Sequence, residues 1–239
     1  MGPSPPALPE APTRIRCWGV SSPLSCEIHY TLPMTDSPIT IRPGQPTVEE
    51  GLVCAKYLDT AAEGFFGILL GRRAPEIVAH AYTQPGNEYS FENVLFATRE
   101  DRIVGMALGF TAEERRGFPP NPLKSAKGYP RLRAGVIGFV ASPMFRILEI
   151  LADGDFYVLS LAVDPEQRGH GIGSALIEAT EERARASGST RCAIDVAAKN
   201  KGAQRLYTRH SFEVYAKWPK HLNLAALSLL RMAKPIHPD

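Results

Sequence analysis

Three closely spaced glycines, Gly169, Gly171 and Gly173, constrain the fold of this chain more than any other feature. They follow residues 156–163, a nearly continuous apolar run typical of an inner strand, and they precede a helical pattern. Glycines let backbone N–H groups approach an anion, and the beginning of a helix adds unsatisfied donors and partial positive charge. The sequence therefore predicts a phosphate or pyrophosphate site between a buried strand and a helix.

The residues around the glycines distinguish this loop from two other phosphate-binding loops. A P-loop would continue with Gly-Lys-Ser/Thr, and these glycines do not. A dinucleotide-binding loop has another glycine spacing, and the present loop comes late in the chain, after strands with an antiparallel pattern. On the loop alone, a glycine-rich turn that binds nothing remains an alternative. The helix after the loop has an apolar face that includes Ile172 and Leu176, and an i,i+4 pair of Glu181 and Arg185 opposite it.

A second motif lies on the helix that follows the predicted strand 190–197. Its residues are Asn200, Ala203, Leu206, Tyr207 and Phe212. Together with Arg168, Gly171 and Gly173, it resembles the acyl-CoA signatures of the GNAT N-acetyltransferase superfamily, Arg/Gln-x-x-Gly-x-Gly/Ala and Asn-x-x-Ala-x-x-Leu-Tyr ending in Gly-Phe. Ser211 stands where the family usually has glycine, which affects the turn more than the chemistry. Over roughly residues 38–234 the chain is similar to a bacterial-type, single-domain member.

The resemblance implies an α/β (α+β) architecture, the GNAT acyl-CoA N-acyltransferase fold, with helices on both faces of a mixed, mostly antiparallel twisted sheet. The residue patterns predict the same order of elements. Strands are expected at about 38–42, 93–98, 103–110, 156–163, 190–197, 212–218 and 226–233. Helices are expected at about 48–55, with a capping box of Thr47 and Glu50, and at about 60–70, 143–151, 172–187 and 200–207.

The chain is expected to have one catalytic domain with additions. Residues 1–37 are rich in proline and lack periodicity, so we expect a disordered N-terminal extension. A natural start at Met34 and a genuine tail from Met1 are both left open. The GNAT domain is expected over residues 38–239, and its stretch 111–154 is an insertion that either walls the cleft or forms a loose loop.

The resemblance also implies a set of contacts to acetyl-CoA, the expected co-substrate. The backbone of the central strand would run beside the pantetheine arm, and the loop N–H groups would hold the pyrophosphate, with the Arg168 side chain at its rim. The predicted cofactor-binding residues are Leu161, Ala162, Val163, Arg168, Gly169, His170, Gly171, Ile172, Gly173, Ser174, Asn200, Ala203 and Tyr207. Two alternatives stay open: Arg168 as a solvated surface residue, and Asn200 as an N-cap.

Direct transfer of an acetyl group needs a neutral amine and a proton for the departing thiolate. Tyr207 is the predicted proton donor, because a phenol is protonated at neutral pH; packing in the core is its alternative role. Glu149 and Glu63 are weaker candidates for a base, and each could equally be a solvated charge. His170 lies within the loop, where the role is mostly that of the backbone, so we do not expect it to be a base.

Composition narrows the partners. The net charge of +2 offers no broad basic field, so nucleic acid is not expected as a partner. The spacing of the cysteines matches neither a metal site nor a disulfide framework; they are Cys17, Cys26, Cys54 and Cys192. We therefore expect no metal, and we expect the protein to reside in a reducing cytoplasm. No apolar run is long enough to span a bilayer, so no membrane partner is expected.

The predicted activity is acetyl-CoA-dependent N-acetyltransfer, an acyltransferase reaction, to a primary amine that the sequence does not identify. A small molecule is favoured as the acceptor because the insertion is able to wall the cleft. A protein N-terminus or lysine, and a catalytically silent acyl-CoA-binding module, are the alternatives. A homodimer is left open.

Overall fold

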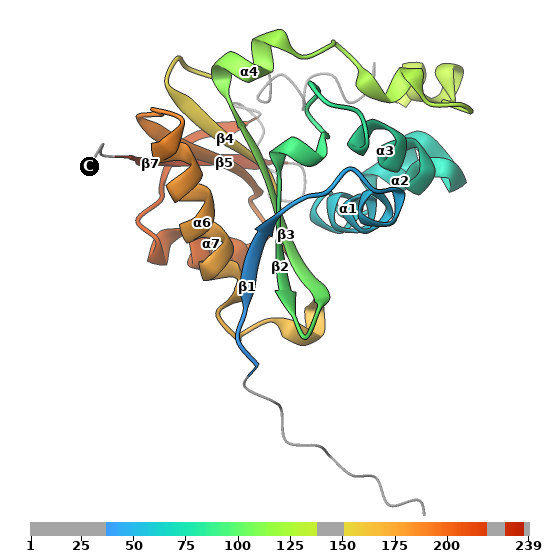
Figure 1. Ribbon diagram of the computed structural model, residues 1–239. Coiled ribbons are helices and arrows are strands. Elements are labelled where there is room, and N and C mark those ends of the chain that lie inside the picture. The colour runs from blue at the N-terminus through green and yellow to red at the C-terminus, as the bar shows by residue number, and fades with distance from the viewer. Residues whose placement is uncertain (1–36, 138–150, 219–227, 237–239) are drawn as a thin grey trace, which may run out of the picture. The chain divides into compact units, whose positions relative to one another are not determined.

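The computed structural model describes residues 37–137, 151–218 and 228–236 (Figure 1). Contacts group Ser37–Asp239 into one unit, separate from Met1–Asp36. The expected N-terminal extension therefore lies almost wholly outside the described residues. So do Glu149 and most of the helix predicted at 143–151.

A sheet of seven strands runs through the unit in the order β1-β2-β3-β4-β5-β7-β6. The strands are β1 (Thr40–Pro43), β2 (Val94–Arg99), β3 (Arg102–Thr111), β4 (Asp155–Val163), β5 (Arg191–Ala197), β6 (Glu213–Trp218) and β7 (Leu229–Pro235). All neighbours pair antiparallel except β4 and β5, which pair parallel. The predicted strands are thus present, each within a few residues of its expected bounds.

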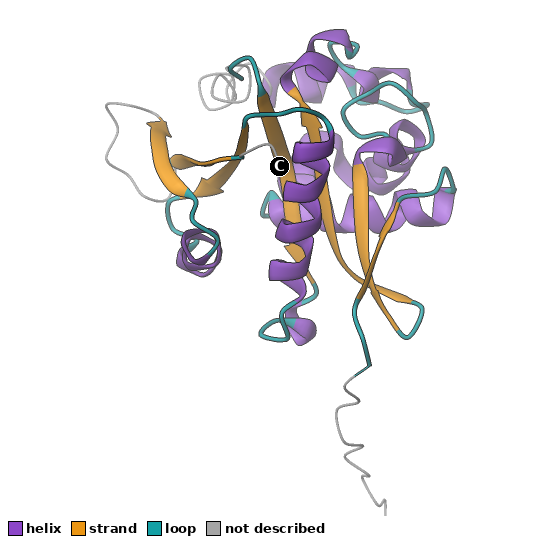
Figure 2. Ribbon diagram, turned by 60° about the vertical axis from the view of Figure 1, so that its left-hand side comes forward, coloured by secondary structure: helices purple, strands orange, loops and turns teal. Residues whose placement is uncertain are grey.

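Helices cover both faces of this sheet (Figures 1 and 2). The helices α1 (Val48–Ala61), α2 (Phe65–Leu70) and α3 (Ala74–Tyr82) lie on one side. There they bury a cluster that includes Tyr57, Tyr82, Phe96, Leu108 and Tyr157, called here the α1-side core. On the other side α6 (Ile172–Ala186) packs on β2, β3 and β4, and α7 (Lys201–Arg209) adds Tyr207 to a cluster with Phe156, Val158 and Ile177, the α6-side core.

The beginning of α1 confirms half of the predicted capping box. Thr47 Oγ1 accepts a hydrogen bond from the Glu50 backbone N–H at 3.2 Å, which satisfies one donor of the first turn. The Glu50 carboxylate does not return to Thr47. It accepts from Gln45 N–H at 2.7 Å and from the Tyr82 hydroxyl at 2.9 Å, and it pairs with Arg42.

The helix predicted at 60–70 is wrong in its bounds. The helix α1 continues to Ala61, and the chain then turns through Glu63 and Gly64, which have φ of 53° and 85°. The short α2 follows, and the Asp59 carboxylate accepts from the Gly67 N–H at 2.9 Å across the turn. The helix α3 was not predicted. Its apolar residues begin so soon after the end of α2 that helical spacing in the sequence does not separate the two helices.

The described part of the insertion is ordered. Thr111 and Glu114 form a capping box at the beginning of α4 (Ala112–Gly117), with both reciprocal hydrogen bonds present. A 3-10 turn, Pro122–Ser125, follows, and Leu123 and Ala126 are buried in the α1-side core. A further helical stretch occupies residues 131–137.

The polar face of α6 differs from the sequence pattern. Glu181 and Arg185 do form their i,i+4 pair at 4.0 Å, but Glu181 is buried rather than solvated. Its carboxylate accepts from Lys234 Nζ at 2.7 and 2.8 Å, so it ties α6 to β7.

Candidate active site

The loop after β4 has the conformation expected of an anion cradle. Gly169 and Gly171 have φ of 83° and 80°, a region that residues with a side chain rarely adopt, and a Cβ at either would meet no atom within 4 Å. Gly171 is the N-cap of α6, and the first turn of α6 carries no acidic residue. Open space, free N–H donors and the positive end of a helix therefore coincide here.

Gly173 has a different role from the other two glycines. A Cβ at this position would lie 2.9 Å from Leu206 Cδ2, so the missing side chain lets α7 approach α6 closely. Beside it, the Ser174 hydroxyl is 2.9 Å from His210 Nε2, which links the same two helices. Gly173 thus has a packing reason of its own, and the prediction of an anion site rests on Gly169 and Gly171.

Two arginines lie at the rim of this loop. Arg168 is exposed, and its Nε donates to the carbonyl oxygen of Val163, the last residue of β4, at 3.3 Å. Arg99, which the sequence did not single out, donates from Nη1 to Gln167 Oε1 at 2.9 Å. His170 and Gly171 are exposed and Ile172 is buried in the core beneath them.

The pairing of β4 with β5 stops partway along both strands. Four residue pairs form the ladder, from Asp155 with Arg191 to Val158 with Ile194. Beyond that point β5 pairs with β7, and the β5-facing edge of β4 has no strand partner among the described residues as far as Val163. The predicted backbone contacts Leu161, Ala162 and Val163 all lie along this unpaired edge, directly before the glycine loop.

A β-bulge in β4 lies at the beginning of the unpaired edge. Leu108 of β3 pairs with Ser160, and the next residue, Gly109, pairs with Val158. Leu159 is therefore an extra residue on β4. Side chains alternate between the two faces of a strand. One inserted residue therefore moves each later side chain to the face opposite the one that unbroken alternation would give.

Tyr207 lies beside the point where the strands part. Only 4% of it is exposed, and it lines a small apolar cavity together with Val158, Leu161 and Ile194. Its ring packs against Phe212, and its hydroxyl has no hydrogen-bond partner among the described residues. Burial raises the pKa of Tyr207 well above its ordinary value, so the hydroxyl stays protonated.

The other predicted site residues are placed as follows. Asn200 is the N-cap of α7 and accepts from the Ala203 N–H at 3.0 Å, so its alternative role as a cap is confirmed. Glu63 lies in the turn between α1 and α2, not on a helix as predicted. Its carboxylate pairs with Lys199, just after β5, so this turn approaches the end of β5 that no longer pairs with β4.

The sequence did not identify a buried polar cluster at the same place. Asp195, the first residue of β5 beyond the ladder, accepts from Arg231 Nε and Nη2 at 2.9 and 2.8 Å and from the Tyr157 hydroxyl at 2.9 Å. The side chains of Asp195 and Arg231 are 7% and 5% exposed. Burial, followed by the nearby Asp195 charge, raises the pKa of Tyr157. The sequence analysis did not single out Asp195, because its partners Tyr157 and Arg231 lie 38 and 36 residues away along the chain.

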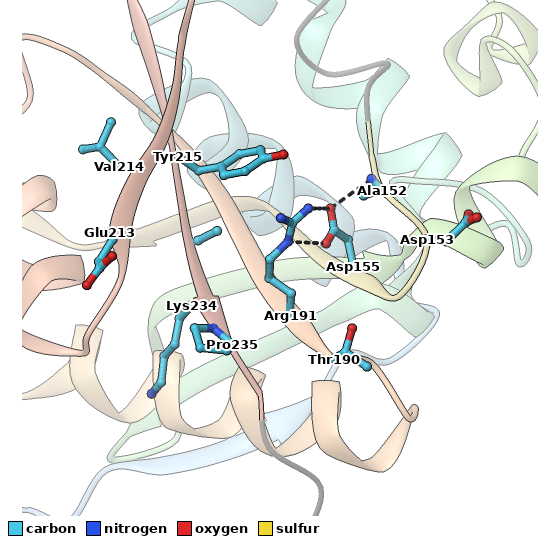
Figure 3. Close-up of a pocket in the computed structure, with 11 residues that line it drawn as sticks. Ala152, Asp153, Asp155, Thr190, Arg191, Glu213, Val214, Tyr215, Lys234 and Pro235 are labelled. Atoms are coloured by element: carbon cyan, nitrogen blue, oxygen red, sulfur yellow. Dashed lines mark hydrogen bonds and ion pairs between the residues drawn. The ribbon is translucent and has the colours of Figure 1, made fainter.

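A cavity of about 470 Å³ lies at the other end of the parallel pair, where β4 and β5 begin (Figure 3). Most of its charged groups are already paired: Arg191 donates to Asp155 at 2.6 and 2.9 Å, Lys234 binds Glu181, and Asp153 pairs with Arg116. The Tyr215 ring lies 4.6 Å from the Arg191 guanidinium. This cavity has neither the glycines nor the free N–H donors, so the candidate site is the glycine loop and the edge of β4.

Neither a metal centre nor a membrane-spanning helix is found among the described residues. The described residues contain no group of three or more His, Cys, Asp or Glu side chains placed to hold a metal ion. Within the same residues, no helix is both long and apolar enough to cross a membrane.

Comparisons with known proteins agree with this geometry. The model of the acetyltransferase (GNAT) family matches residues 68–212. A solved acetyltransferase with 21% sequence identity covers 83% of this chain and 100% of its own, with a TM-score of 0.59. An N-acetyltransferase from Staphylococcus aureus Mu50 has 14% identity, covers 82% and 100%, and has a TM-score of 0.63. An acetyltransferase of the GNAT family from Streptococcus pneumoniae has 19% identity, covers 84% and 100%, and has a TM-score of 0.50. No curated protein matches the chain.

Proposed function

The chain belongs to the GNAT acetyltransferase family, and on that premise we propose that it transfers the acetyl group of acetyl-CoA to a primary amine of a small molecule. The observation that carries this proposal is the loop at the N-terminus of α6, where Gly169 and Gly171 leave open space beside free N–H donors. A diphosphate fits there because nothing acidic lies in the first turn of α6.

The residues of the chain would hold the co-substrate along two adjoining surfaces. The N–H groups of residues 168–174 bind the diphosphate, and Arg168 adds charge at the rim. The unpaired edge of β4, from Leu161 to Val163, offers N–H and C=O groups to the pantetheine arm. When bound, acetyl-CoA supplies an activated thioester, and the bulge of β4 lies where its acetyl group would reach.

The reaction then needs few groups from the protein. The nitrogen of a neutral amine forms a bond with the acetyl carbon, and the carbon–sulfur bond breaks. N–H groups on the open edge of β4 stabilise the oxyanion, and the Tyr207 hydroxyl donates its proton to the sulfur. The attacking nitrogen, positively charged once it has bonded to the acetyl carbon, loses a proton to water to give the amide, and Tyr207 is protonated again from water.

A small acceptor is favoured by the described part of the insertion. Arg133 Nε donates to the Ile68 carbonyl oxygen at 2.9 Å, and Leu123 is buried against α3. The described part of the insertion therefore packs against α2 and α3, which supports a walled site, and a walled site suits a small amine better than a protein segment. A protein N-terminus or lysine remains the second candidate, and a non-catalytic acyl-CoA-binding module the third. Homodimer formation and a cytoplasmic location stay predictions.

The test combines binding with turnover on the full chain. Acetyl-CoA at about 100 times its Kd should stabilise the fold by about 2.7 kcal/mol, which a shift in Tm measures. Release of CoA is then followed with spermidine, tyramine, L-lysine and a peptide with N-terminal alanine as acceptors. We expect turnover with at least one small amine and less with the peptide. Turnover with the peptide alone would favour a protein acceptor, stabilisation without turnover would favour a silent module, and an unchanged Tm would contradict the proposal.

A further inference from the structure

Ser160 on β4 is a buried hydroxyl without a partner. The residue is 4% exposed, and its Oγ has no hydrogen-bond partner in the part of the chain that the structure describes. Buried hydroxyls nearly always have a partner, because losing water without replacing its hydrogen bond costs free energy. An orphan of this kind, in a strand that borders the candidate site, calls for a functional reason.

The bulge at Leu159 decides which way Ser160 faces. Before the bulge, Val158 belongs to the α6-side core. After it, the cross-strand neighbour Leu108 and the i+2 neighbour Ala162 belong to the α1-side core. Directly paired residues and residues two apart share a face of the sheet, so Ser160 faces the helices α1 to α3.

Ser160 is also placed where the two substrates would meet. It lies two residues beyond Val158, the last residue of β4 that pairs with β5, at the beginning of the unpaired edge. A diphosphate held at the N-terminus of α6 brings the thioester to this edge from the α6 side. With the α6 side taken by the co-substrate, the opposite side, which Ser160 faces, is left for the acceptor.

The polar cluster around Asp195 on the neighbouring strand is already largely engaged. The carboxylate of Asp195 accepts from two nitrogens of Arg231 and from the Tyr157 hydroxyl. The Ser160 hydroxyl, by contrast, has no hydrogen-bond partner among the described residues.

We propose that the Ser160 hydroxyl binds the acceptor amine, accepting a hydrogen bond from its N–H and directing the nitrogen lone pair at the acetyl carbon. This inference rests on the proposed function, and it adds a contact to the acceptor rather than to the cofactor. No proton of the reaction is assigned to Ser160. In the free protein the hydroxyl has no hydrogen-bond partner among the described residues, which lowers stability. The bound acceptor would supply the missing partner.

The test is Ser160→Ala in the full chain, with acetyl-CoA and the best amine of the panel above. The kcat/KM for the amine should fall by roughly tenfold, the scale of one lost hydrogen bond. The KM for acetyl-CoA should not change. The Tm of the free variant should be equal to or above that of the wild type, because an orphan polar atom has been removed.

Ser90→Ala is the matched control. Ser90 is also buried, but its hydroxyl accepts from the Glu92 N–H at 3.2 Å and donates to the Glu92 carboxylate at 3.0 Å. This variant should have a lower Tm and unchanged kinetics, the reverse of Ser160→Ala.

Three outcomes would overturn the role of Ser160. If wild-type turnover is present and Ser160→Ala retains it, the hydroxyl does not bind the acceptor, while the proposed function stands. If Ser160→Ala loses Tm as Ser90→Ala does, the hydroxyl has a partner in the free protein. If the wild type neither binds acetyl-CoA nor releases CoA with any amine, the proposed function fails and the role of Ser160 fails with it.

Discussion

At the scale of single residues, Tyr207 lies in the core and is also the proton donor that we propose. Its ring packs among Val158, Leu161 and Phe212, as expected for a buried aromatic residue. Its hydroxyl, unpaired among the described residues, has a raised pKa because of burial. A raised pKa keeps the proton on the hydroxyl, but it also makes proton transfer to a thiolate less favourable. For comparison, the ordinary pKa of a cysteine thiol is about 8.5. Stabilisation of the developing thiolate by a hydrogen bond, followed by transfer, is the role that both facts allow.

The variant Tyr207→Phe separates the two roles, because it keeps the ring and removes only the hydroxyl. If the hydroxyl donates to sulfur, kcat should fall by about 10²-fold with little change in acetyl-CoA affinity. Steady-state kinetics with one good amine, together with the Kd for acetyl-CoA, measure both effects. Unchanged kcat would remove Tyr207 from the catalytic residues, and weaker affinity at unchanged kcat would assign its hydroxyl to cofactor binding.

At the scale of elements, the two ends of α6 can be compared, because each is bounded by a glycine with positive φ. Its N-cap is Gly171, with φ of 80°, and Gly188 follows its C-terminus with φ of 72°. Both glycines face open space, so a side chain at either would strain the backbone without a clash. Only the first of them lies in the loop that we assign to the diphosphate.

This symmetry gives a prediction with an internal control. Gly171→Val and Gly188→Val should each lower stability by about 1–3 kcal/mol, because a β-branched residue is forced to positive φ. Only Gly171→Val should also lose the stabilisation by acetyl-CoA. Thermal denaturation with and without acetyl-CoA measures both quantities. Equal stabilisation of the two variants would show that the N-terminus of α6 does not hold the cofactor.

At the scale of the described unit, the sheet consists of two parts joined by a short parallel ladder. The strands β1 to β4 form one part and β5 to β7 the other, with four residue pairs between them. Side chains from outside the sheet add links between the parts. Glu63 pairs with Lys199, and Glu181 of α6 pairs with Lys234. The partial ladder leaves an open backbone edge on β4, while these two ion pairs add contacts between the two parts of the sheet.

Both cores of the unit bury tyrosines, which predicts a loss of stability in alkali. Burial is the main reason for the raised pKa of Tyr57, Tyr82, Tyr89, Tyr157 and Tyr207. In the unfolded chain they ionise near pH 10, so above about pH 10 the unfolded state binds fewer protons and the free energy of unfolding falls as pH rises. Below that pH both states are protonated and this contribution is constant.

Thermal denaturation between about pH 8 and 11, with tyrosinate absorbance as a second probe, measures this effect. The absorbance of these tyrosines should rise together with unfolding, and Tyr207→Phe should make the alkaline slope shallower by one proton. Ionisation of all tyrosines before unfolding would contradict the protection that burial implies.

Local patterns determined much of this protein. The glycine loop, α6, the N-cap of α7 and the order of the strands follow from signals a few residues long: alternation, helical spacing, Gly conformations and caps. Each of these signals acts within one element, so it can be recognised from residues that are close together in the sequence. The family resemblance came from the same two segments, because the glycine loop and α7 carry their signals in consecutive residues.

Only the tertiary structure decided the rest, because it depends on residues far apart in the sequence. Gly173 is required by the approach of Leu206, and Asp195 is held in the interior by its contacts with Arg231 and Tyr157. The place where β4 stops pairing with β5, and the bulge that turns Ser160 toward α1, are properties of register between strands. Periodicity shows that a strand has a buried face, but it does not show which partner covers that face or where the partner ends.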